Sequence, residues 1–75
     1  MISLARLAMG QRARVESILG DDELSLRLME MGLIPGTEVQ VLGVAPLGDP
    51  IEIELRGYRL SLRRSEGERV EVEPA

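Results

Sequence analysis

The most regular pattern of hydrophobic and polar positions lies in the last third of the chain. Apolar residues alternate with glutamates in residues 51–55, and with other polar residues in residues 58–62. Such alternation is typical of strands with one buried face. If residues 56 and 57 form the loop, Glu54 faces Arg59 and both faces agree with one hairpin register. The first loop residue is an arginine, which would need a positive φ in a two-residue turn, so a slightly longer loop is the alternative.

Three further segments carry strand patterns. Residues 13–18 alternate imperfectly, with Ser17 on the face of the preceding apolar residues, and residues 69–73 alternate valines with charged residues. Residues 38–44 alternate until Gly43, where the parity slips. A glycine at such a slip predicts a bulge or a sharp bend.

A helical pattern covers residues 22–31. Either Asp21 or Asp22 can cap its first turn. A buried stripe at i, i+4 and i+7 is formed by Leu24, Leu28 and Met31. Leu26 and Met29 do not fit this stripe. Either the N-terminal residues 2–8, which favour a single helical turn, cover them, or they form an exposed apolar patch.

The helix is followed by a double stop. Gly32 suits the left-handed conformation that closes a helix, after which the next residue folds back on Leu28. Pro35 and Gly36 suit the two central positions of a type II turn. We interpret these three residues as structural turn positions with no chemistry of their own.

The strands, the helix and the frequent turn residues predict the fold class. We expect a mainly β protein with one short helix inserted after the first strand, folded as a single domain over residues 1–75. With five short strands in so small a chain, we expect a closed or nearly closed barrel, because closure hides the sheet edges.

The amino-acid composition argues against several classes of function. The net charge is −4, all nine cations are arginine, and the chain has one Tyr and no Cys or His. An acidic chain with one aromatic residue argues against nucleic-acid binding and against binding to anionic membranes. Without Cys or His, neither an ordinary catalytic triad nor a thiolate nucleophile can form. We therefore expect no enzyme and no cofactor.

The remaining candidate chemistry is sparse. The acidic run 21–23 suits helix capping far better than a weak oxygen-ligand metal site. Arg27 can cover the core or pair with Glu23 one turn earlier, and the alternative is that it reaches an acidic partner. No apolar run approaches the length of a membrane span, and residues 1–14 lack a secretory signal, so a cytoplasmic location is expected by default.

Two motifs carry a resemblance to a known family. Residues 27–36 hold an Arg-Leu pair, then Gly-Leu and Pro-Gly, and residues 45–50 read Ala-Pro-Leu-Gly-Asp-Pro. In this order and spacing they resemble the ferrous-iron transport protein A family, FeoA, in its stand-alone form. The resemblance implies a small five-stranded SH3-like β-barrel and an accessory protein of bacterial ferrous-iron uptake. The partner it implies is a FeoB-type GTP-dependent membrane permease, bound on the cytoplasmic side and without direct membrane insertion.

A binding module of this kind needs a contact surface. We expect it on the outer side of the helix, extended by the loop before residue 51, with candidate residues Leu26, Met29, Pro46, Leu47, Gly48, Asp49 and Pro50. For the loop residues, plain turn chemistry is an equally good explanation. The alternative function is a divalent-metal-binding or metal-sensing domain that uses carboxylates, related to the C-terminal domain of iron-dependent repressors. The sequence leaves self-association open.

Overall fold

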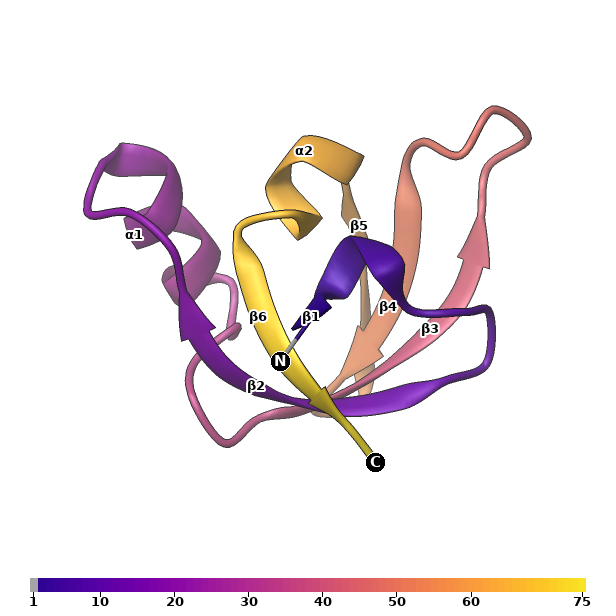
Figure 1. Ribbon diagram of the computed structural model, residues 1–75, viewed down its shortest axis with the longest axis horizontal. Coiled ribbons are helices and arrows are strands. Elements are labelled where there is room, and N and C mark those ends of the chain that lie inside the picture. Colours follow the sequence, from indigo (N-terminus) through magenta and orange to yellow (C-terminus); the bar gives the residue numbers. More distant parts are fainter. Residues whose placement is uncertain (1) are drawn as a thin grey trace.

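The computed structural model describes residues 2–75, which form one antiparallel sheet with three short helical segments (Figure 1). The strands are β1 (Ile2–Ser3), β2 (Arg12–Ile18), β3 (Glu38–Val44), β4 (Ile51–Leu55), β5 (Tyr58–Leu62) and β6 (Val70–Pro74). The helical segments are a 3₁₀ turn η1 (Leu4–Arg6) and the helices α1 (Glu23–Glu30) and α2 (Arg64–Gly67). The strand order is β1-β6-β2-β3-β4-β5, so β1 and β5 are the edges of a sheet that bends without closing. The mainly β class and the helix after the first long strand are as predicted, and β1 is an additional short strand.

The β4–β5 hairpin has the predicted register, with Glu54 opposite Arg59. Arg56 and Gly57 have φ of 50° and 83°, so the loop has two residues, and the longer alternative is wrong. The expected contact between the two charges does not form, since the ion pairs found within residues 2–75 do not include them.

Two strands contain bulges. The β3–β4 register shifts between Val41 and Gly43, which confirms the predicted irregularity. β2 shifts against β6 between Val15 and Ser17. This second bulge turns Ser17 away from the core. On the outer face of the sheet, the Ser17 hydroxyl donates to the Glu71 carboxylate at 2.9 Å. The prediction that Ser17 shares the buried face was therefore wrong.

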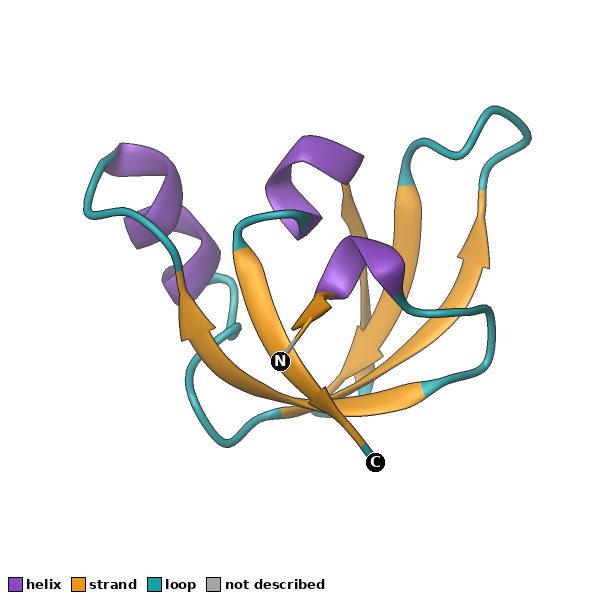
Figure 2. Cartoon of the chain, viewed as in Figure 1, coloured by secondary structure: helices purple, strands orange, loops and turns teal. Residues whose placement is uncertain are grey.

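The core fills the hollow of the bent sheet. Its members are less than 8% exposed and come from every strand except β1, together with η1, α1 and the turn after α1: Leu4, Ala5, Leu7, Ala13, Val15, Leu28, Leu33, Val39, Val41, Ile51, Ile53, Leu55, Leu62, Val70 and Val72. Figure 2 shows α2 and the η1 turn lying together at the open side of the sheet, with α1 at one end. Gly67 of α2 packs on Ala5, where an added Cβ would lie 3.5 Å from the Ala5 backbone nitrogen. The N-terminal turn therefore covers the core and leaves the outer face of α1 free.

Helix α1 begins and ends as its sequence indicates. The Asp22 carboxylate accepts the Ser25 amide hydrogen at 3.2 Å. At the other end, the Leu33 amide donates to the Leu28 carbonyl at 3.2 Å, and Gly32 has a φ of 108°. This hydrogen bond and the positive φ are those of a Schellman stop. The following turn is closed by a 3.1 Å bond from the Thr37 amide to the Ile34 carbonyl, with Gly36 at a φ of 92°.

Candidate functional site

Two exposed apolar features stand out among the predicted contact residues. On α1, the side chains of Leu26 and Met29 are 58% and 37% exposed, and we call them the helix patch. They border a shallow groove of about 380 Å³ whose other lining residues, from 20 to 25, are mostly polar. The two interpretations of Leu26 and Met29 were burial under the N-terminal turn and an exposed apolar patch, and the exposed patch is correct.

The second feature is the β3–β4 loop, where Leu47 is 97% exposed. The loop is held at its base, because the Ala45 amide donates to the Pro50 carbonyl at 3.0 Å and the Gly48 amide donates to the Ala45 carbonyl at 2.7 Å. It is also tied to α2, because the Asp49 carboxylate accepts the Arg64 amide hydrogen at 2.9 Å. Leu47 is thus presented to solvent from an ordered turn, an arrangement that lowers the entropy cost of binding.

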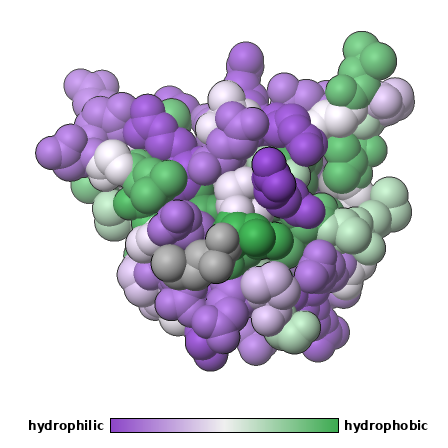
Figure 3. Space-filling model, viewed as in Figure 1, coloured by the Kyte–Doolittle hydropathy of each residue, from purple (hydrophilic) through white to green (hydrophobic). Residues whose placement is uncertain are grey.

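These two features do not lie side by side. Along the longest axis of the molecule, which measures 30 Å, α1 stands at one end and the β3–β4 loop at the other (Figure 1). Figure 3 shows apolar atoms near α1 and at the loop tip, with polar atoms over α2 between them. The expectation that the loop extends the helix patch into one surface was therefore wrong, and the two are separate candidates.

Helix α2 connects the two ends through ion pairs and hydrogen bonds. The Arg27 guanidinium of α1 pairs with the Glu66 carboxylate of α2 at 3.0 Å, and Arg64 donates to the loop as described above. The predicted pairing of Arg27 with Glu23 was wrong, because a partner distant in sequence lies closer. The Glu66 carboxylate accepts the Arg63 amide hydrogen at 2.8 Å, which is one half of a capping box. Arg63 has no side-chain acceptor for the other half, so the sequence contained no capping signal for α2.

The acidic run before α1 is engaged in holding the helix. Both Asp22 carboxylate oxygens accept from the Arg69 guanidinium, at 2.6 and 2.9 Å. These hydrogen bonds, followed by the one from the Ser25 amide, lower the pKa of Asp22 from 3.8 to about 2. Throughout residues 2–75, no three His, Cys, Asp or Glu side chains gather in a way that could hold a metal ion. The capping interpretation accounts for Asp22.

No helix within residues 2–75 has both the length and the apolar character needed to cross a bilayer.

Comparison with known proteins decides the family. The family model of the FeoA domain matches residues 2–74. The chain belongs to the FeoA domain family. This confirms the resemblance carried by residues 27–36 and 45–50.

Relatives of this FeoA domain occur alone and as part of larger proteins. A curated relative from Porphyromonas gingivalis, an "Fe(2+) transport protein A/Fe(2+) transporter FeoB fusion protein", is 34% identical over 70 residues. The match takes in 93% of this chain but only 8% of the length of that relative.

Solved structures support the fold. The NMR structure of a FeoA-like protein from Clostridium acetobutylicum is 40% identical with a TM-score of 0.92, over 97% of this chain and 85% of that one. FeoA from Stenotrophomonas maltophilia, crystallised with zinc and described as a prokaryotic SH3 domain protein, is 34% identical with a TM-score of 0.85, over 97% and 91% of the two chains. The predicted SH3-like architecture is therefore confirmed. The T. acidophilum IdeR protein, 20% identical with a TM-score of 0.86 over 34% of its length, shares the fold.

Proposed function

We propose that this FeoA domain is a non-catalytic accessory of ferrous iron transport that binds a FeoB transporter from the cytoplasmic side. The observation that carries the proposal is the Porphyromonas gingivalis fusion, in which a segment 34% identical to this chain shares one polypeptide with FeoB. Covalent linkage keeps two modules at a high effective concentration, which is useful when the modules act on one another. A domain that is not fused needs a binding surface to obtain the same proximity.

The loop tip is the first candidate for that surface. Leu47 is almost fully exposed on an ordered turn, and Pro46, Gly48, Asp49 and Pro50 complete the loop. An exposed apolar side chain on an ordered turn gains free energy when an apolar pocket on a partner buries it. The helix patch is the second candidate, and its distance from the loop makes the two separable by mutation.

The proposal is tested by binding to full-length FeoB in nanodiscs, measured by surface plasmon resonance. We expect Leu47→Glu to weaken binding if the loop tip is the contact, and Met29→Glu to weaken it if the helix patch is. Met9→Glu is the matched control, since Met9 is 68% exposed and lies outside both features. Failure of the wild-type domain to bind the full-length transporter would overturn the proposed function, whereas retained binding in both variants would overturn only the assigned surfaces.

Direct binding of a divalent metal is the second candidate function, favoured by the zinc in the Stenotrophomonas maltophilia structure. The donors available to it in this chain are carboxylates and main-chain oxygens, since the sequence has no Cys or His. Calorimetry with Fe²⁺ under anaerobic conditions, and with Zn²⁺, separates the two functions. Tight stoichiometric binding would favour the metal-binding function, whereas the accessory role predicts none.

A further inference from the structure

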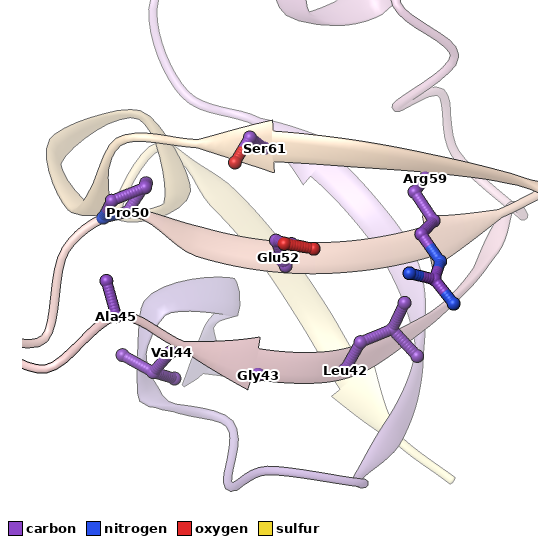
Figure 4. Close-up of a pocket in the computed structure, with 8 residues that line it drawn as sticks. All are labelled: Leu42, Gly43, Val44, Ala45, Pro50, Glu52, Arg59 and Ser61. Carbon is purple, nitrogen blue, oxygen red and sulfur yellow. The ribbon is translucent and has the colours of Figure 1, made fainter.

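The outer face of the sheet carries a hollow that is separate from the helix patch and from the exposed tip of the β3–β4 loop. It has a volume of about 520 Å³ and lies over β3, β4 and β5 (Figure 4). One end of its lining, formed by Val44, Ala45 and Pro50, is apolar. Toward the other end, Leu42 lies near the charged side chain of Arg59. The lining residues are Leu42, Gly43, Val44, Ala45, Pro50, Glu52, Arg59 and Ser61.

Gly43 creates the hollow. Its position in the register is opposite Glu52, on the outward face of the sheet, where any other residue would place a side chain. A Cβ built on Gly43 has no atom within 4 Å, and its φ lies outside the left-handed region that favours glycine. Backbone geometry therefore does not require a glycine here, unlike at Gly32. The glycine leaves open space between the apolar end and the charged residues.

The charges at the hollow are free to bind. Glu52 and Arg59 are exposed, and neither takes part in the ion pairs or side-chain hydrogen bonds found within residues 2–75. Along β4, Glu52 lies two residues beyond Pro50, and Arg59 is paired with the residue two further on, Glu54. Glu54 shares the third position with Arg59, but it lines the separate hollow beside Arg56 and is not part of this lining. The lining itself therefore presents an apolar, an anionic and a cationic feature in order at the two-residue repeat of an extended chain.

We propose that this hollow binds an extended segment of another protein in which an apolar, a basic and an acidic side chain occupy alternate positions. Because same-face side chains of an extended chain recur every two residues, roughly 6.6 Å apart, such a segment lying along β4 brings its three side chains to the three features together. The apolar side chain packs against Ala45 and Pro50, the basic one pairs with Glu52, and the acidic one pairs with Arg59. The order of the charges gives the site a preferred sequence, and the hollow shares Pro50 with the loop proposed to contact FeoB.

The test uses two peptides of equal composition, Ac-Leu-Ser-Arg-Ser-Glu-NH₂ and Ac-Leu-Ser-Glu-Ser-Arg-NH₂, titrated into the ¹⁵N-labelled protein. In amide NMR spectra, the first peptide should shift the signals of residues 43, 52, 59 and 61. The second should bind about tenfold more weakly, which corresponds to about 1.4 kcal/mol from two exposed ion pairs and the repulsions that replace them. Equal binding of the two peptides, or no shift at these residues with the first, would overturn the proposal.

Two variants make the result specific to the hollow. In Gly43→Val a side chain fills the open space without backbone strain, so binding of the first peptide should be lost while the spectrum remains that of the folded protein. Glu52→Arg combined with Arg59→Glu should reverse the preference between the peptides. If Gly43→Val does not fold, the reversal alone decides, and an unchanged preference in the double variant would refute the assignment.

Discussion

Replacement of Gly32 by alanine should destabilise the domain through two separate effects. Gly32 ends α1 with a φ of 108°, a conformation that costs an L-residue roughly 1–2 kcal/mol. In addition, a Cβ at this position would lie 2.8 Å from the Tyr58 hydroxyl oxygen and 3.2 Å from Leu55 Cδ1. That hydroxyl donates to the Met31 carbonyl, so the ring must move and the hydrogen bond is lost.

The expected magnitude is the sum of these two costs. Loss of the hydrogen bond adds roughly 0.5–1.5 kcal/mol, which brings the total for Gly32→Ala to about 1.5–3.5 kcal/mol. A chain of this length has a free energy of unfolding of roughly 4–11 kcal/mol. The variant should therefore still fold, with a melting temperature lowered by roughly 6–28 °C.

Gly36→Ala provides the matched control. Gly36 also has a positive φ, but an added Cβ has nothing within 4 Å, so this variant should lose only the strain contribution of roughly 1–2 kcal/mol. The assay is urea unfolding followed by far-ultraviolet circular dichroism, since the chain has no Trp and one Tyr. Tyr58→Phe removes the clashing oxygen, so Gly32→Ala should cost less in that background than in the wild type. Equal losses for the two glycine variants, combined with additive costs in the Tyr58→Phe background, would refute the reasoning.

Three other perturbations have defined outcomes. Leu28→Ala removes a fully buried side chain that joins α1 to the core. In urea unfolding, the free energy of unfolding should fall by about 2–5 kcal/mol. Arg56→Asn places an Asn-Gly pair in a turn where Arg now has a φ of 50°, and should raise the melting temperature in calorimetry, because relief of the positive-φ strain outweighs the loss of the long 3.4 Å hydrogen bond to the Thr37 hydroxyl. Because the folded-state pKa of Asp22 is depressed from 3.8 to about 2, its contribution to stability is present above pH 3.8 and is lost as the pH falls toward 2. Urea midpoints measured across this range should therefore fall less steeply in Asp22→Asn than in the wild type.

The β4–β5 hairpin could be predicted from the sequence because all its determinants are local. The alternation of residues 51–55 and 58–62 sets both faces and favours the register in which residues 56 and 57 form the loop, which the structure confirms. The bulge in β2 could not be predicted in this way. Its position is set by pairing with β6, and the residues that meet there, Ser17 and Glu71, are 54 positions apart.

In the candidate site, too, local features could be predicted from the sequence and features set by distant contacts could not. The sequence showed that Leu26 and Met29 depart from the buried stripe of the helix, and left open whether the N-terminal turn covers them; the structure shows them exposed. It also predicted that the loop exposes Leu47, which the structure confirms. It did not identify α2, because a four-residue helix is too short to give a periodic signal and depends on its contacts with the N-terminal turn and the loop. Without α2, neither the partner of Arg27 nor the separation of the two apolar features could be inferred.

The pairing of β1 with β6 has a consequence for how this domain can be built into longer chains. Ile2 lies opposite Val72, so the first and last strands are neighbours and their ends emerge on the same side of the molecule (Figure 1). Domains with adjacent termini tolerate insertion into a host protein and circular permutation, because a short connection closes the gap. The same fold can thus serve as a separate subunit or as a covalently attached module.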